Sequence, residues 1–224
     1  EERKKFKLLG KLPSRVETLN EQVIRSYAQL KSYTDLNQKN IFLNELYNTN
    51  QVLFYKLASN NIEEITPLLY TPQVAVSCQT FSNEFRRPHG LYIPYSNKEH
   101  IAEIIDNRPY KDVELIVVTD GERILGIGDQ GVGGIGIPIG KLMLYSLFGR
   151  INPAKTLPII LDVGTNNKNL LNDPIYLGWR HKRISGKKYT DFIDDFVSVL
   201  KQKLPNVLLQ WEDFGKANAP VLLE

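Results

Sequence analysis

A glycine-rich segment that ends in a lysine is the part of the sequence that most suggests chemistry. Residues 124–141 read ILGIGDQGVGGIGIPIGK. Backbone N–H groups in such a segment can bind an anion at the start of a helix, and a lysine at its end can act as a base. The segment is therefore a candidate for nucleotide binding, for binding of a small anion or for proton transfer.

The dinucleotide-binding pattern G-x-G-x-x-G is present at residues 126–131 but lacks one of its requirements. The segment GIGDQG follows a predicted strand and precedes a predicted helix. However, the pattern also needs an acidic residue about 20 residues further on, to bind the ribose hydroxyls. The first acidic residue after Asp129 is Asp162, which is too far along the chain. The glycine pattern alone is weak evidence for a cofactor site.

The phosphate-binding pattern G-x-x-x-x-G-K-[ST] is also incomplete. Ile135 stands where this pattern needs its first glycine, and Leu142 follows Lys141 where it needs serine or threonine. The glycines would instead allow two backbone segments, or a backbone and a small anion, to approach closely.

Lys141 lies in an otherwise apolar stretch, IGIPIGKLMLYSLF, over residues 135–148. Its long side chain can run along apolar neighbours and bring the ammonium group to solvent. Alternatively the amine is buried, in which case its pKa falls and it can act as a base near neutral pH. The residues alone leave both interpretations open.

The second part of the chain, residues 85–224, has the pattern of an α/β domain. Short apolar runs alternate with segments of helical spacing, which predicts a three-layer α/β/α arrangement around a mostly parallel sheet. The predicted strands lie within 90–95, 113–121, 157–164 and 206–214, and the predicted helices lie within 97–107, 136–149 and 189–204.

The first part, residues 1–84, is predicted to be helical, with helices between residues 17 and 66. Apolar residues recur at three- and four-residue steps in 17–33 and again in 40–60. Prolines at positions 67 and 72 are expected to bound a turn near Tyr70.

Acidic residues follow three of the predicted strands. These residues are Asp120, Asp162 and the adjacent pair Glu212 and Asp213. Open parallel sheets bind their ligands beyond the carboxyl ends of the strands. These carboxylates are therefore candidate site residues, although an acidic pair at a strand end can also be simply solvated.

Composition favours an ordinary globular protein. Of 224 residues, 42% are hydrophobic and 24% charged, and the net charge of +3 is too small and dispersed to favour nucleic-acid binding. No apolar run approaches the ~18–20 residues of a membrane span, and a single cysteine excludes an intrachain disulfide. We expect a cytoplasmic protein with no nucleic-acid or membrane partner. Because the sequence starts at Glu1 without a methionine, we expect the N-terminus to be cut.

Other chemically versatile residues carry no shared motif. The three histidines are expected to be surface or structural residues, Cys78 a small buried residue, and the two tryptophans packing residues. The residues concerned are His89, His100, His181, Cys78, Trp179 and Trp211. Asp162 is expected to be a structural residue or a residue that supports the site from behind it.

Six segments occur in an order, and with gaps, that resemble the malic enzyme family. They are LLYTPQVAVSCQ, FRRPHGLYI, VVTDGERILGIGDQGVGGIGIPIGKLMLY, LPIILDVGTNN, LLNDPIYLGWR and LLQWEDFGKANA. The resemblance covers nearly the whole chain. The segment GTNN followed by LLNDPIYLGWR is most similar to the NAD-linked bacterial branch.

The resemblance implies an activity and a set of site residues. Malic enzymes convert L-malate to pyruvate and CO2, reduce NAD or NADP, and require Mg²⁺ or Mn²⁺. By resemblance, Tyr70 is the general acid that protonates enolpyruvate and Lys141 is the base that takes the hydroxyl proton. Arg123 binds a malate carboxylate and contributes to the cofactor site. Glu212 and Asp213 bind the metal, because hard oxygen ligands suit these ions.

The family's chemistry places a requirement on Lys141. It must be neutral to accept a proton, and we expect burial and the adjacent cation to keep it so. Without the resemblance, Arg123 is equally well explained by a surface ion pair with Glu122 or Asp120.

The resemblance also implies parts that lie outside this chain. The third carboxylate ligand and the NAD-binding domain are expected beyond residue 224, so the fragment alone should not reduce NAD at a useful rate. The N-terminal helices are expected to mediate self-association to a dimer or tetramer. Fumarate activation is not expected, because Gln22 and Arg25 match two of the family's effector residues but Thr49 replaces the third.

Two alternatives remain. One is malolactic enzyme, a relative that forms lactate and CO2 from malate without net redox change. The other is a non-catalytic oligomerisation fragment, which exposed-looking tyrosines of the helical part would suit. The intact segments DGERILG and GIGIPIGK favour malic enzyme over malolactic enzyme, and the non-catalytic alternative is left to be tested by the turnover of a Lys141→Ala variant.

Overall fold

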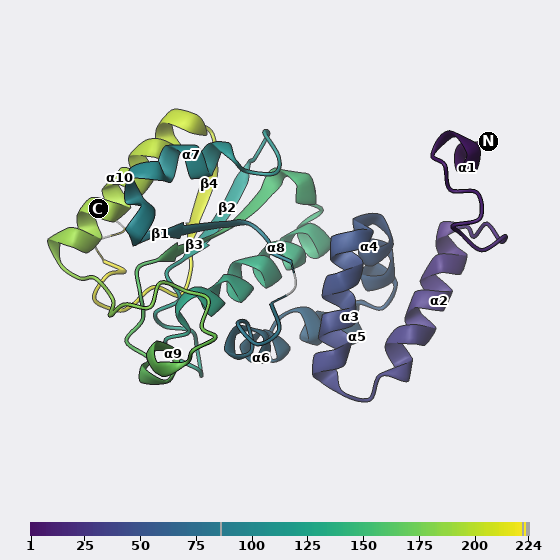
Figure 1. Ribbon diagram of the computed structural model, residues 1–224, viewed down its shortest axis with the longest axis horizontal. Helices are drawn as coiled ribbons and strands as arrows, with labels where there is room; N and C mark the ends of the chain where they lie inside the picture. The colour runs from purple at the N-terminus through teal and green to yellow at the C-terminus, as the bar shows by residue number, and fades with distance from the viewer. Residues whose placement is uncertain (86, 221, 223–224) are drawn as a thin grey trace.

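The computed structural model describes residues 1–85, 87–220 and 222 (Figure 1). Four parallel strands form one sheet in the order β1-β3-β2-β4. Their bounds are Leu91–Pro94 for β1, Leu115–Thr119 for β2, Thr156–Asp162 for β3 and Leu208–Trp211 for β4. Three strands lie within their predicted runs and β3 begins one residue before its run, so the α/β prediction with a parallel sheet is confirmed.

Helices cover both faces of the sheet. Helices α7 (Ile101–Asp106) and α10 (Lys187–Lys203) lie on one face, and α8 (Gly136–Gly149) lies on the other (Figure 1). Along β2, Ile116 and Val118 pack with the α7 and α10 side, whereas Leu115 and Val117 pack with α8. This alternation follows from the two-residue period of a strand, and it produces the three predicted layers.

The N-terminal part is helical, as predicted. Its helices are α1 (Glu2–Lys5), α2 (Leu19–Ser32), α3 (Leu36–Thr49), α4 (Gln51–Asn60), α5 (Ile62–Leu69) and α6 (Gln73–Gln79). Thr18 and Glu21 form a capping box at the start of α2. The periodic run 40–60 is not one helix, because Asn50 ends α3 and its side chain caps α4.

Several connections are short helical turns. They are the 3₁₀ segments η1 (Tyr95–His100), η2 (Gly131–Ile135) and η3 (Pro153–Lys155), and helix α9 (Lys168–Asn172). The predicted helix 97–107 is thus divided between η1 and α7. Pro67 lies inside α5 rather than at the edge of a turn, and of the two prolines only Pro72 lies in the turn after Tyr70, directly before α6.

Helix α8 joins the two parts of the chain. Its Met143 is buried in the helical core with Leu43, Phe54 and Leu57, while its Leu142 faces the sheet. In Figure 1, α8 runs between the sheet and the N-terminal helices. A residue of α8 can therefore meet side chains from both parts.

The expectation that no apolar run approaches membrane-span length was wrong. The continuous helical stretch Gly131–Gly149 is 19 residues long and apolar enough to qualify by length and composition. Half of it is buried between the sheet and the helical part, which is the position of a core helix. Its apolar character follows from being covered on two sides.

Candidate functional site

Lys141 and Glu212 are joined by an ion pair at the carboxyl-terminal edge of the sheet. Lys141 lies in the second turn of α8, and Glu212 directly follows β4. The Lys141 Nζ is 2.6 Å from the Glu212 Oε2, and their side chains are 20% and 17% exposed. Lys141 therefore neither extends freely into solvent nor is isolated in an apolar core.

Tyr70 lies beside this pair at the carboxyl end of α5. The Lys141 Nζ is 6.0 Å from the centre of the Tyr70 ring. The ring packs with Val74, Cys78 and Ile137, and burial raises the pKa of its hydroxyl. Lys141 lowers that pKa through its charge and a hydrogen bond, whereas Glu212 and its acidic neighbour raise it. The phenol thus lies within the field of the amine and both acids.

Gly140 provides the space that Tyr70 needs. A Cβ at this position would lie 2.8 Å from the Leu69 carbonyl oxygen and 2.9 Å from the Tyr70 Cδ2. Such distances are too short for a real side chain, so any larger residue would displace the ring. A similar requirement applies at Gly134, whose Cβ would lie 2.6 Å from the Gly121 Cα. The glycine-rich segment thus allows close packing, as predicted.

Asp213 turns the chain at the end of β4. The strand pairing continues to Glu212, whose backbone N–H donates to the Val118 carbonyl. Asp213 has a φ of +55°, which is uncommon for a residue other than glycine. Burial and then the neighbouring Glu212 carboxylate raise the pKa of Asp213, while Lys141 lowers it. In a continuing strand two adjacent side chains would point to opposite faces. Here the chain turns at Asp213, and the Glu212 carboxylate acts on that of Asp213.

Arg123 lies at the rim of this arrangement. It is exposed in the loop after β2, and its backbone N–H donates to the Asp213 carbonyl at 3.2 Å. Arg123, Glu212 and Asp213 line the same open pocket of about 560 Å³. The expected alternative, an ion pair with Glu122 or Asp120, is not formed in the described part of the chain. The guanidinium is therefore available to a ligand.

The charge state of Lys141 differs from the expectation of a neutral amine. Burial lowers the pKa of Lys141, but the hydrogen bond from its ammonium to Glu212 and the nearby Tyr70 raise it, and the net shift is upward. The expectation of a neutral amine combined burial with an adjacent cation, whereas this structure places a carboxylate in direct contact with the amine. In this state Lys141 is a cation.

Glu212 and Asp213 fit one side of a site for a hard divalent cation. Their mutual repulsion raises the pKa of Asp213, and a cation between them would relieve it. Among residues 1–85, 87–220 and 222, no group of three or more potential metal ligands is present. A complete coordination shell would therefore need a ligand from elsewhere.

A second group of charged residues joins the loops that follow β2 and β3. Of its members, only Asp120 is a candidate predicted from the sequence. The buried Arg183 binds both carboxylate oxygens of Asp129 at 2.7 and 2.8 Å. The Tyr189 hydroxyl donates to Asp120 at 2.7 Å, and Arg183 lies 3.9 Å from the same carboxylate. Only the position of Asp120 after a strand signalled this group, because Arg183 lies in a segment without a motif.

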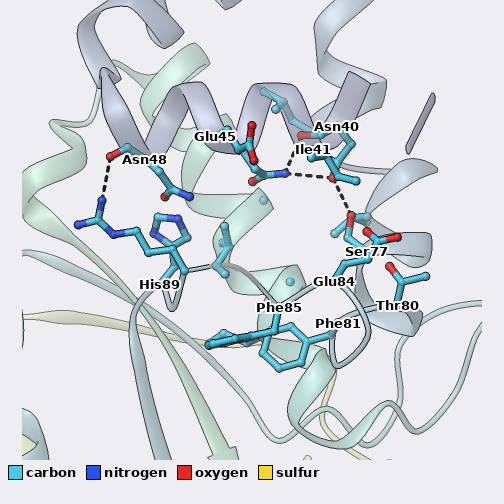
Figure 2. A pocket seen from close by; sticks show the side chains of 18 of the residues that line it. Asn40, Ile41, Glu45, Asn48, Ser77, Thr80, Phe81, Glu84, Phe85 and His89 are labelled. Atoms are coloured by element: carbon cyan, nitrogen blue, oxygen red, sulfur yellow. Dashed lines mark hydrogen bonds between the residues drawn. The ribbon is translucent and has the colours of Figure 1, made fainter. Parts of the chain in front are cut away.

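The other side of α8 faces a different pocket (Figure 2). Asn40 donates to the Leu68 carbonyl at 2.6 Å and accepts from Asn44 and Ser77 at 3.0 Å each. We call Asn40, Asn44 and Ser77 the amide cluster, and Tyr70, Lys141, Glu212 and Asp213 the sheet-edge cluster. The cavity beside the amide cluster has about 140 Å³, enough for a few water molecules.

The remaining expectations concern packing residues. Cys78 is buried and free, as expected. His89 is half-buried against Tyr47, and His181 stacks on Trp179. Asp162, at the end of β3, accepts hydrogen bonds from two backbone N–H groups, consistent with a structural role.

Comparisons with known proteins identify the family. Residues 47–224 match the family model of the malic enzyme N-terminal domain. The chain is 52% identical over 223 residues to the NAD-dependent malic enzyme 2 of Photobacterium profundum and 51% identical over 224 residues to the NAD-dependent malic enzyme of Erwinia tasmaniensis. A third relative, the NAD-dependent malic enzyme of Proteus mirabilis, is 52% identical over 223 residues.

These matches cover all of this chain but only part of the relatives. In each of the three, the chain spans 40% of the relative's length. The matched region includes every residue of the sheet-edge cluster and Arg123. On this evidence the chain belongs to the malic enzyme family.

Proposed function

We propose that the complete protein is an NAD-dependent malic enzyme, which oxidises L-malate and releases pyruvate and CO2. The observation that carries the proposal is the meeting of Tyr70, Lys141, Glu212 and Asp213, from three distant parts of the sequence, at one edge of the sheet. The names of the relatives support the use of NAD.

The proposed roles follow from the chemistry of each group. Oxidation at C2 of malate transfers a hydride to NAD and a proton to Lys141. Loss of CO2 from oxaloacetate leaves enolpyruvate, whose C3 takes a proton from Tyr70. Tyr70 then regains a proton from Lys141, whose Nζ lies 6.0 Å from the ring centre. The overall result is pyruvate, CO2 and NADH.

Lys141 must lose a proton before it can accept one. Its pKa is raised chiefly by the contact with Glu212. A cation bound to Glu212 would offset the negative charge of that carboxylate, lower the pKa of Lys141 and so favour the neutral amine. Mg²⁺ or Mn²⁺ would be held by Glu212 and Asp213, and it would acidify the malate hydroxyl and stabilise the enolate oxygen.

Arg123 is proposed to bind a carboxylate of malate and to contribute to the cofactor site. A planar guanidinium suits a carboxylate because it can donate two parallel hydrogen bonds. Its exposed position beside Glu212 and Asp213 supports this role. The hydride acceptor NAD is proposed to bind mainly to parts of the complete protein that this chain does not include.

We propose self-association through the N-terminal region. Residues 1–18 extend away from the rest of the molecule in Figure 1. Phe6, Leu9, Val16 and Ile24 are more than half exposed, an arrangement typical of a contact surface. We also propose a cytoplasmic location and no fumarate activation. Gln22 and Arg25 bind Glu17 of their own segment.

Product analysis of the complete protein tests the proposal. With L-malate, NAD and Mn²⁺ we expect pyruvate together with NADH. Lactate without NADH would indicate malolactic enzyme instead. If Lys141→Ala retained full turnover, the sheet-edge cluster would have no catalytic part and the helical region's role in assembly would be the remaining function.

A further inference from the structure

Two residues outside the sheet-edge cluster, Tyr145 and Gln210, form a series of hydrogen bonds that ends on Glu212. On α8, Tyr145 follows Lys141 by four residues, and on β4, Gln210 precedes Glu212 by two. Four residues of an α-helix rise about 6 Å, and two residues of a strand rise about 6.6 Å. The helix and the strand therefore present matching pairs. Tyr145 Oη lies 2.8 Å from Gln210 Oε1, and Lys141 Nζ lies 2.6 Å from Glu212 Oε2.

A third hydrogen bond joins the two pairs along β4. The Gln210 Nε2 donates to the Glu212 Oε2 at 2.8 Å. Because an ionised carboxylate only accepts hydrogen bonds, the amide of Gln210 must turn its NH2 group to Glu212. Its carbonyl oxygen then faces Tyr145, whose hydroxyl must donate. The chemistry of Glu212 thus determines every donor and acceptor in the series.

Both donors reach the same oxygen of Glu212. Lys141 and Gln210 bind Oε2, and within the described part of the chain no hydrogen bond reaches Oε1. The carboxylate therefore cannot rotate without losing two hydrogen bonds. One of its oxygens is committed to the protein, and the other is left for a ligand.

The position of Gln210 in the sheet makes a purely structural explanation weak. β4 is an edge strand, and its four residues are exposed or half-exposed. A glutamine there would ordinarily be solvated, and replacing it would change stability little. Here its amide instead connects a helix tyrosine with an acid of the site.

We propose that Gln210, oriented by Tyr145, is a positioning residue that fixes the Glu212 carboxylate for binding of a divalent cation. The inference rests on the proposed function, because it assigns Glu212 to that cation. Neither Gln210 nor Tyr145 touches the substrate in this proposal. Their effect reaches the site only through Glu212, and it should therefore be seen in cation affinity before any turnover.

The test is a titration of the complete protein with Mn²⁺ in the absence of malate and NAD. Electron paramagnetic resonance measures the free Mn²⁺ at each step and so gives the Kd. Gln210→Met keeps the length of the side chain and removes both hydrogen bonds. We expect the Kd for Mn²⁺ to rise about 10- to 100-fold, the usual effect of losing a group that orients a ligand. Tyr145→Phe should raise it less, because Gln210 can still donate to Glu212.

A double variant separates positioning from general damage. If Tyr145 acts only through Gln210, Tyr145→Phe combined with Gln210→Met should bind Mn²⁺ as Gln210→Met alone does, so that the effects are not additive. The matched controls are Gln202→Met, on an exposed position of α10, and Tyr110→Phe, on an exposed loop. Both controls should bind Mn²⁺ as the unmodified protein does.

The outcomes distinguish this inference from the proposed function. Unchanged Mn²⁺ affinity in Gln210→Met, additive effects in the double variant, or an unmodified protein that binds no Mn²⁺ would each overturn the inference. If Mn²⁺ binds and weakens as expected but malate gives no pyruvate, the proposed function fails while the positioning of Glu212 stands. If Gln210→Met is too unstable to titrate, Tyr145→Phe decides, and unchanged affinity in that variant overturns the role of Tyr145.

Discussion

Helix α8 separates two polar regions of opposite character. On one side lies the sheet-edge cluster, with a cation, two acids and a phenol that are each partly exposed. On the other side lies the amide cluster, in which Asn40 is 6% exposed and bonds to neutral partners only. Gly140 lines the pocket beside the amide cluster, whereas Lys141, the next residue of α8, belongs to the sheet-edge cluster.

The difference teaches how to tell a reactive site from a structural one. In the amide cluster, donors and acceptors are matched, and no like charges face one another. In the sheet-edge cluster, the Glu212 carboxylate raises the pKa of the adjacent Asp213, and the phenol of Tyr70 is held beside a cation. Two adjacent carboxylates beside an open pocket are expected where a bound ligand supplies the missing positive charge.

The sharpest test of the comparison is Lys141→Met. Turnover of the complete protein should fall about 10²- to 10⁴-fold, the usual contribution of a positioned base. The free energy of unfolding should fall by about 1–3 kcal/mol, a smaller effect, because the mostly buried Glu212 carboxylate loses its charged partner. Steady-state kinetics and urea unfolding measure the two effects. Lys187→Met, which removes an exposed ion pair on α10, should change neither.

Gly140→Ala affects the boundary between the two regions. The new Cβ would meet the Tyr70 ring and the Leu69 carbonyl at less than 3 Å. We expect turnover to fall about 10²-fold, since a displacement near 1 Å suffices for that. Overpacking should also lower the free energy of unfolding by about 1–3 kcal/mol. Gly149→Ala, on the same helix with its nearest atoms at 3.7 and 3.9 Å, serves as the control. Equal behaviour of the two variants would contradict the role given to Gly140.

Asp120→Asn should change how the stability of the folded protein depends on pH, because Asp120 is a buried titratable carboxyl group. Burial raises the pKa of Asp120 to about 6, although Arg183 and Tyr189 lower it. Between its ordinary pKa of 3.8 and about 6, the folded protein keeps a proton that the unfolded chain releases. The stability contributed by this proton is complete below pH 3.8 and is lost as the pH rises through about 6.

The variant has no such proton. Its free energy of unfolding should therefore rise relative to the unmodified protein by about 3 kcal/mol as the pH increases through that window. Urea unfolding at a series of pH values measures the difference. Two parallel stability curves would show that Asp120 does not titrate in this way.

Asn40→Ala should have the smallest effect and, unlike Lys141→Met, should change stability alone. The substitution leaves the buried Leu68 carbonyl without its side-chain donor, and the Ser77 hydroxyl keeps only the Gln73 carbonyl as an acceptor. We expect a loss of about 1–3 kcal/mol in the free energy of unfolding and unchanged kcat and KM in the folded enzyme. Asn60→Ala, at an exposed position of α4, should change neither quantity. If Asn40→Ala lost turnover while keeping its stability, the conclusion that the amide cluster is purely structural would be wrong.

Much of the fold could be predicted because its signals are local. Apolar runs located all four strands, and three- and four-residue spacing located the helical part. The errors lie where a single side chain decides the backbone, as at Asn50, which ends one helix and caps the next. Pro67 inside α5 is another case, since tertiary packing maintains a helix that local propensity would end.

The sequence by itself determined the family, the alternation of strands and helices, and the identity of five candidate site residues. It could not give the charge state of Lys141, because that depends on Glu212, which is 71 positions away and is brought to 2.6 Å only by the packing of α8 against β4. Nor could it find the Arg183 ion pair or the bonds of Tyr145 and Gln210. Periodicity records which face of an element is apolar, whereas a pKa or a hydrogen bond depends on which element lies opposite, and only the tertiary structure decides that.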